Sequence, residues 1–135
     1  MPQVVDTGIL FALADRSDAW HERARAWAES SSETLLAPVT ILTEVAYLLR
    51  ERIGPDAEAA FVESLARGEL AVENLSAKDW TRTLDVMRSY TQLGFVDATV
   101  VAIAERLKVR TIATTDRRHF GMVRPAHVDR FTLVP

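Results

Sequence analysis

The chain has 135 residues, of which 48% are apolar and 26% charged, proportions that are typical of a globular protein and allow a single domain over residues 1–135 with its own core. It contains no cysteine, which excludes disulfides, thiol catalysis and cysteine-bound zinc or iron–sulfur centres, so any metal ion must be held by oxygen or imidazole. A net charge of −3 argues against a broad basic surface for duplex DNA, but it is compatible with an acidic, metal-holding centre that acts on phosphodiesters.

The first half of the chain alternates short apolar runs with segments of helical spacing. A buried strand is predicted at Pro2–Val5, and after a turn at Asp6 a helix is predicted over Thr7–Ala14. The elements that follow are a helix at Asp18–Ala28, a strand at Thr34–Ala37, a helix at Pro38–Arg52 and a helix at Ala57–Ala66. The Pro38–Arg52 helix has proline at its start and Gly54 just past its end, which is the usual asymmetry of helix termini.

The second half continues the alternation. Its predicted elements are a strand at Leu70–Asn74, a helix from Ser76 to about Gln92, a helix at Asp97–Leu107 and strands at Val109–Thr114 and Phe131–Val134. Ser76, with Asp79 three residues later, has the spacing of a capping box. Short strands alternating with helices predict an α/β fold, a three-layer α/β/α sandwich with a short, mainly parallel central sheet.

Glu44 is the first of four carboxylates whose positions are unusual. It lies at helical spacing from Ile41, Val45 and Leu48, which predicts that it projects along the inward face of its helix. An ion pair with an arginine is the structural alternative for a single core-facing glutamate.

Asp97 and Asp6 repeat this relation to apolar neighbours. Asp97 precedes Val100, Val101 and Ala104 by three, four and seven residues. Asp6 has the same spacing from the apolar residues of the helix that follows it. An ionised group on such a stripe costs several kcal/mol when it is buried without compensation.

Asp116 ends the strand Thr111–Thr115, and Asp6 also follows a predicted strand. The carboxyl ends of parallel strands form the crevice in which α/β proteins bind ligands. An aspartate after a strand is also a common helix cap, and that alternative stays open for both residues.

Four carboxylates converging on one crevice would repel one another unless divalent cations neutralise them. Oxygen ligands without cysteine favour Mg²⁺ or Mn²⁺ over zinc. Such a centre activates water and stabilises the charge on a phosphodiester as it breaks. We therefore interpret Asp6, Glu44, Asp97 and Asp116 as catalytic metal ligands.

The sequence around these acids resembles the PIN domain family, and more narrowly the VapC-type ribonuclease toxins. The resemblance rests on four segments and covers nearly the whole chain: Val4–Thr7, Thr43–Val45, Asp97–Ala98 and Thr114–Phe120. It implies a compact α/β/α sandwich that cuts single-stranded or loop RNA with Mg²⁺ or Mn²⁺.

Residue by residue, the resemblance assigns the acidic metal cluster to Asp6, Glu44, Asp97 and Asp116. Thr114 matches the small hydroxyl residue that supports the site, and Thr7 occupies the hydroxyl position after the first acid. The resemblance also implies a homodimer and a cognate antitoxin, part of which would lie across the active groove. No apolar run is long enough for a membrane helix, so we expect a soluble, cytoplasmic protein without a membrane partner.

Arg117, Arg118 and His119 follow Asp116 directly, which suggests that they line the rim of the site and contact substrate phosphates, while a solvated loop is the equal alternative. Asp6-Thr7-Gly8 also spells an aspartic-protease motif, but that class is all-β, whereas most of this chain is predicted to be helical. A non-catalytic RNA- or protein-binding module with the same fold is the alternative function.

Overall fold

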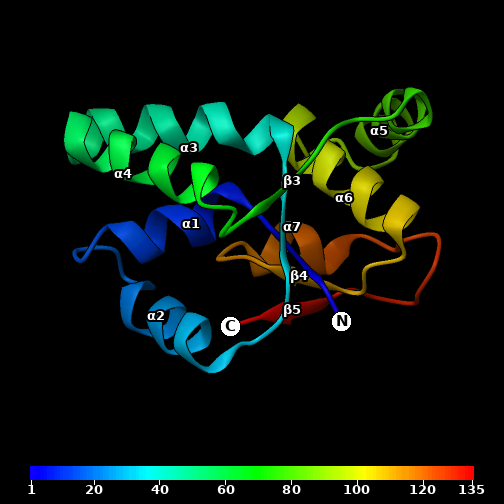
Figure 1. Ribbon diagram of the computed structural model, residues 1–135. Helices are drawn as coiled ribbons and strands as arrows, with labels where there is room; N and C mark the ends of the chain where they lie inside the picture. The colour runs from blue at the N-terminus through cyan, green and yellow to red at the C-terminus, as the bar shows by residue number, and fades with distance from the viewer.

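A parallel sheet of five short strands forms the centre of the computed structural model, which describes residues 1–135 (Figure 1). The strands are β1 (Gln3–Val5), β2 (Leu35–Pro38), β3 (Ala71–Glu73), β4 (Thr111–Ala113) and β5 (Thr132–Val134). Their order in the sheet is β3-β2-β1-β4-β5, and every neighbouring pair is parallel. The central strand is therefore β1, with β2 on one side and β4 on the other.

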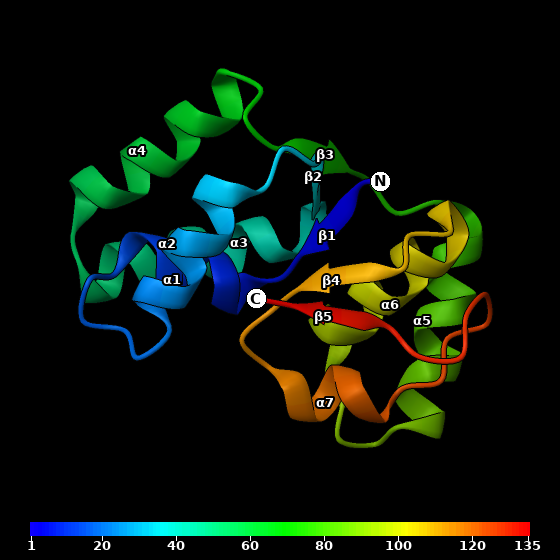
Figure 2. The ribbon, with the colours of Figure 1, turned by 90° about the horizontal axis from the view of Figure 1, so that it is seen from below.

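Seven helices surround this sheet, and six of them form two groups. Their bounds are α1 (Thr7–Ala14), α2 (His21–Ser30), α3 (Val39–Arg52), α4 (Pro55–Ala66), α5 (Ala77–Ser89), α6 (Phe95–Leu107) and α7 (Arg117–Met122). In Figure 2, α1 to α4 lie to the left of the strands and pack against one another, whereas α5 and α6 form a pair on the right. The predicted α/β/α architecture is confirmed, and the sheet is parallel throughout.

Strands β1 and β4 and helix α6 contribute many of the residues of the buried core. Val4, Val5, Ile112 and Ala113 are fully buried, as expected for strands with a covered layer on both faces. Every residue from 98 to 104 in α6 is buried too, because this helix lies between the sheet and α5. No helix combines the length and the apolar character that crossing a membrane requires.

Side-chain capping explains where two helices begin. The capping box is confirmed: Ser76 Oγ accepts the N–H of Asp79 at 3.3 Å, and Asp79 Oδ2 accepts the N–H of Ser76 at 2.9 Å, so that α5 begins at Ala77. The helix predicted from Asp18 begins later, at His21, because Asp18 Oδ1 accepts the N–H of Trp20 in a preceding turn.

The short helix α7 was not indicated by the sequence pattern. Phe120 is its only buried residue, so there is no apolar stripe to reveal it. Asp116 caps it instead, since Asp116 Oδ1 accepts the N–H of His119 at 2.9 Å. Arg117 and Arg118 therefore form the first turn of a helix and not a loop, and both are exposed to solvent.

Candidate metal centre

The candidate site lies where the chain leaves β1 and β4. These strands are parallel neighbours, so their carboxyl ends meet at the same edge of the sheet. The backbone N–H of Asp6 donates to the carbonyl of Ala113 at 3.1 Å, which holds the carboxyl end of β1 next to the carboxyl end of β4. The residues that follow, Asp6 on one strand and Thr114 to Asp116 on the other, are thereby brought side by side.

Asp6 is a buried carboxylate, and each of its two oxygens accepts a hydrogen bond. Oδ1 caps α1 by accepting the N–H of Ile9 at 3.0 Å, and Oδ2 accepts a short hydrogen bond from the Thr114 hydroxyl. Burial raises the pKa of Asp6 to about 6; the two hydrogen bonds act against this rise, and the charges of Asp97 and Asp116 add to it. The capping interpretation thus holds for Asp6, but it does not exclude a second role.

Thr114 links the first and last acids of the site. Its side chain is fully enclosed: the hydroxyl donates to Asp6 and accepts the backbone N–H of Asp116 at 2.8 Å. The Thr114 N–H itself donates to Val134 on β5 at 2.8 Å. The predicted supporting position is therefore occupied by a residue that ties Asp6 and Asp116 together.

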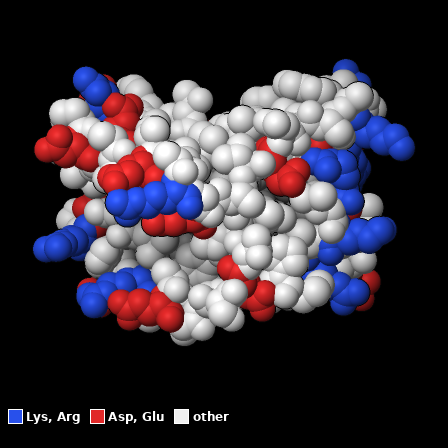
Figure 3. Space-filling model, viewed as in Figure 1, with Lys and Arg blue, Asp and Glu red and all other residues white.

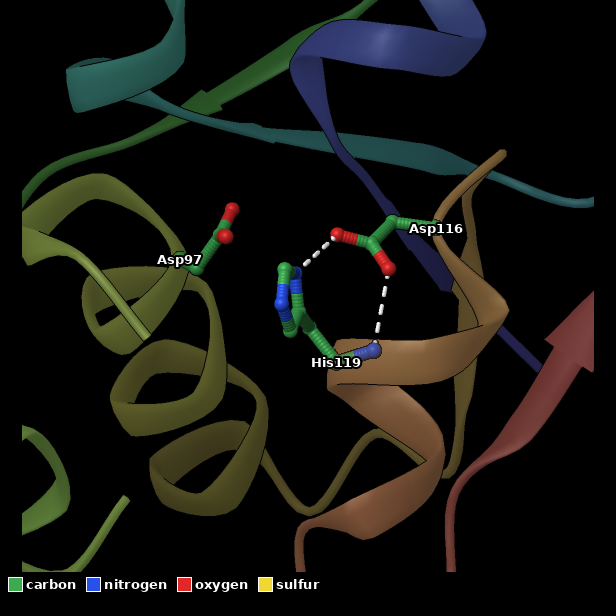
Figure 4. A group of neighbouring side chains, drawn as sticks. All are labelled: Asp97, Asp116 and His119. Atoms are coloured by element: carbon green, nitrogen blue, oxygen red, sulfur yellow. Dashed lines mark hydrogen bonds and ion pairs between the residues drawn. The ribbon is translucent and has the colours of Figure 1, made fainter. Parts of the chain in front are cut away.

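Asp97 and Asp116 face each other across the side chain of His119 (Figure 4). One donor atom from each of these three residues lies within 4.8 Å of the other two. Asp97 belongs to the first turn of α6 and is half-buried, and burial, followed by the charges of Asp116 and Glu44, raises its pKa, whereas His119 lowers it. Like charges thus meet in a partly desolvated space.

Glu44 lies at the exposed margin of the site, so the prediction of an inward-facing glutamate was wrong. The buried face of α3 is formed by Ile41, Val45 and Leu49, four residues apart, and Glu44 flanks that stripe. Its Oε1 accepts the hydroxyl of Thr7 at 2.6 Å, which joins α3 to the first turn of α1. Thr7, which was predicted to place a hydroxyl group at the site, therefore donates a hydrogen bond to one of the four acids.

The acids have no basic partner among lysines and arginines. Neither Asp6, Glu44 nor Asp97 forms an ion pair, and the one ionic contact of Asp116 is with His119 at 2.6 Å. The arginine pairing considered for Glu44 is therefore absent. A donor set of carboxylate oxygens with one imidazole, carrying uncompensated negative charge, fits a divalent cation such as Mg²⁺ or Mn²⁺.

The two arginines after Asp116 do not approach this cluster through any hydrogen bond or ion pair. Arg117 donates to the carbonyl of Pro135, and its guanidinium lies 5.8 Å from the centre of the Trp20 ring. Arg118 is exposed and has no ionic partner in the chain. Their assignment as phosphate-binding residues stays a prediction.

The residue that sequence reasoning left out is His119. It was considered only as part of the rim, yet it stands between two of the acids. The available signal was its position three residues after Asp116, which places it above that residue once the segment is helical.

The most voluminous pocket lies elsewhere. It measures about 520 Å³ between α1, α3 and α4, and it is mainly apolar, with Leu10, Leu49 and Phe61 in its lining. None of the four acids lines it, so it is separate from the acidic centre.

Comparison with known proteins agrees with this geometry. The family model of the PIN domain matches residues 4–124. The chain is 34% identical to "Ribonuclease VapC26" of Mycobacterium tuberculosis over 134 residues, which covers 98% of this chain and 99% of that protein.

Solved structures show the same fold. Mycobacterium tuberculosis VapC20, described as a sarcin-ricin loop cleaving toxin, superposes with a TM-score of 0.82 at 22% identity over 95% of this chain and 98% of that one. A toxin–antitoxin complex from Klebsiella pneumoniae gives 0.70 at 19% identity, covering 90% and 92%. With a matching family model, a close relative along nearly its whole length and this shared fold, the chain belongs to the PIN domain family and, within it, to the VapC group.

Proposed function

We propose that this protein is a metal-dependent endoribonuclease, which hydrolyses RNA phosphodiester bonds with Mg²⁺ or Mn²⁺, and that it is the toxin component of a toxin–antitoxin pair. The observation that carries the proposal is the meeting of Asp6, Asp97 and Asp116 at one edge of the sheet without a lysine or arginine partner. The similarity to a protein named as a ribonuclease, along nearly the entire chain, supports it.

Four residues would hold the ion: Asp6, Glu44, Asp97 and Asp116. When bound, Mg²⁺ or Mn²⁺ neutralises these carboxylates, activates water for attack on phosphorus and stabilises the charge that develops on the phosphodiester. Because each carboxylate oxygen has two lone pairs, the capping contacts of Asp6 and Asp116 leave acceptor capacity for a cation.

The hydroxyl residues fix the orientation of these acids. Thr114 holds Asp6 and Asp116 through one hydroxyl group, and Thr7 holds Glu44 at 2.6 Å. Contacts of this kind reduce the reorganisation that ligand side chains need when they bind an ion or a substrate. We assign both threonines a positioning role.

Substrate and partners follow from the same proposal. Arg118, with a free and exposed guanidinium close in sequence to Asp116, is the better candidate for a substrate phosphate, while Arg117 already contacts Pro135. Solved relatives described as toxin–antitoxin complexes support a protein antitoxin as partner. A homodimer is proposed from the family resemblance.

RNA cleavage assays test this function. Purified protein is incubated with a structured RNA in Mg²⁺, in Mn²⁺ and in EDTA, and Asp6→Asn is compared with Asp85→Asn, an exposed aspartate of α5. We expect metal-dependent product from wild type and Asp85→Asn. Asp6→Asn should lower the rate by roughly a hundredfold, because an amide cannot carry the charge that holds the cation.

RNA that is bound but left intact in every metal would instead favour the non-catalytic RNA- or protein-binding module. Equal cleavage rates for Asp6→Asn and wild type would refute the role assigned to Asp6.

A further inference from the structure

Trp20 contacts two guanidinium groups that come from distant parts of the chain. Cζ of Arg23 is 4.1 Å from the centre of the Trp20 ring, and Cζ of Arg117 is 5.8 Å from it. Both distances are within the range of a cation–π contact. Because they share one ring, the two guanidinium carbons lie within about 10 Å of each other.

Neither of these arginines is neutralised by a bound acid. Arg23 and Arg117 are exposed, and neither forms an ion pair within the chain. The carbonyl of Pro135 accepts one N–H of Arg117. A guanidinium has five N–H donors, so Arg117 keeps donors for a ligand.

The pair lies at the margin of the acidic centre. Arg117 directly follows Asp116, and its contact with Pro135 places its guanidinium at the end of β5. In Figure 4, Asp97 and β5 lie on opposite sides of Asp116. Arg117 therefore extends away from the space between the two acids, toward Trp20.

An RNA backbone needs cations beside such a centre. A divalent ion neutralises the acids that hold it, but every further phosphate of the chain brings another negative charge. The protein has a net charge of −3, and on the face drawn in Figure 3 the basic side chains form small separate groups, several of them beside acids. This distribution favours binding through local arginines.

Two arginines held on one ring suit this task. A guanidinium binds phosphate oxygens through parallel N–H donors, and its planar face stacks on an aromatic ring. Trp20 is half-buried and packs against the core, which gives the arginines a fixed support. Side chains that are already held in place lose less conformational entropy when a ligand binds.

We propose that Arg23 and Arg117, positioned by Trp20, bind a backbone phosphate that flanks the scissile bond of the RNA, on the Asp116 side of the centre. The inference rests on the proposed ribonuclease function and adds a substrate contact to the one proposed for Arg118. The two arginines are the binding groups, and Trp20 is a positioning residue.

RNA binding in EDTA tests the inference without cleavage. A fluorescein-labelled single-stranded oligouridine is titrated with wild type, Arg23→Gln and Arg117→Gln at several salt concentrations. The control is Arg25→Gln, in the same helix as Arg23, because Arg25 is already paired with Glu29 at 2.9 Å. Loss of one phosphate contact should reduce the slope of log affinity against log salt by about 0.7 and the affinity by about fivefold near 0.1 M salt. The control should keep the wild-type slope.

The positioning role of Trp20 has its own test. Trp20→Leu keeps both charges but removes the ring, and it should weaken RNA binding by about threefold, whereas Trp20→Phe should largely restore the affinity. In the Arg23→Gln background the effect of Trp20→Leu should be smaller, since part of what the ring holds is gone. Fully additive effects would contradict the positioning role.

Cleavage kinetics in Mg²⁺ give a separate readout. Arg23→Gln should raise KM by about fivefold and leave kcat within about twofold, because the contact is equal in the bound substrate and in the transition state. Arg23→Gln and Arg117→Gln proteins with wild-type affinity, salt slope and KM overturn the inference, and RNA cleavage by them leaves the proposed function standing. RNA that is bound with the predicted slopes but never cleaved would remove the enzymatic function and keep the phosphate contact.

Discussion

Asp6 has a raised pKa because it combines burial with proximity to other acids. The carboxylate caps α1 and accepts from Thr114, but burial outweighs these contacts and raises its pKa to about 6. Near neutral pH the metal-free protein therefore keeps an ionised group in a place that disfavours charge. Its ionisation reduces the free energy of unfolding.

This property predicts how stability depends on pH. The pKa of Asp6 is about 6 in the folded protein, above the value of about 3.9 for an unfolded aspartate, so the folded state binds the proton more tightly. The stabilising effect of protonation is complete below the unfolded pKa and is lost as the pH rises through the folded pKa. Between about pH 4 and pH 7 this group should remove on the order of 2 kcal/mol of stability in EDTA.

Urea unfolding of wild type and Asp6→Asn across that pH range measures the effect. Asn does not titrate, so the difference between the two curves isolates the contribution of Asp6. Parallel curves for the two proteins would mean that the carboxylate is not desolvated in the folded state.

The positions of some site residues could be predicted from the sequence, and those of others could not. Asp6, Asp97 and Asp116 were predictable, since each either interrupts an apolar pattern or ends a strand. The exposure of the Glu44 side chain was not predictable, because helical spacing alone does not distinguish the centre of a buried stripe from its margin. His119 was missed because its position depends on a helix with only one buried residue.

Among the elements, the α5–α6 pair determines where Asp97 lies. Arg82 binds Glu105 through two hydrogen bonds of 2.6 and 3.0 Å, and Arg106 binds Asp79 at 2.9 Å. These contacts join the start of α5 to the end of α6, far along the helix from Asp97 in its first turn. They therefore fix the direction of α6 without entering the site.

The capping box at the start of α5 provides a test at this scale. Ser76→Ala removes the side-chain acceptor for the N–H of Asp79, and we expect a loss of about 1 kcal/mol in the free energy of unfolding. Ser89→Ala, an exposed change at the other end of the same helix, serves as the control. Chemical denaturation should place Ser76→Ala below both wild type and Ser89→Ala; equal midpoints for all three would show that the cap does not stabilise α5.

Elements with a clear apolar stripe were predicted to within a few residues, as for α1 and α3. The observed ends of helices differ from the predicted ends where a side chain caps a turn, as Asp18 does before α2. Helix α7 was not predicted because it is stabilised by one capping residue, Asp116, and one buried ring, that of Phe120. Local hydrogen bonding, which leaves little trace in hydrophobic periodicity, accounts for these differences.

Across the whole molecule, the site depends on one neighbour relation in the sheet. Asp6 and Asp116 are far apart in the sequence and become adjacent because β1 pairs with β4. Alternating strands and helices predict a parallel sheet, but they do not give the order of its strands, since that order depends on packing between distant segments. The family resemblance supplied the assignment of the acids that the pattern alone left open.

The most direct test of a shared ion is calorimetric titration of Mn²⁺ into wild type, Asp6→Asn, Asp97→Asn and Asp116→Asn, with Asp85→Asn as control at about pH 7. If carboxylates from these separate segments hold the same ion, each of the three variants should bind at least about tenfold more weakly than wild type, while the control is unchanged. Equal affinity in all five proteins would contradict the shared metal centre.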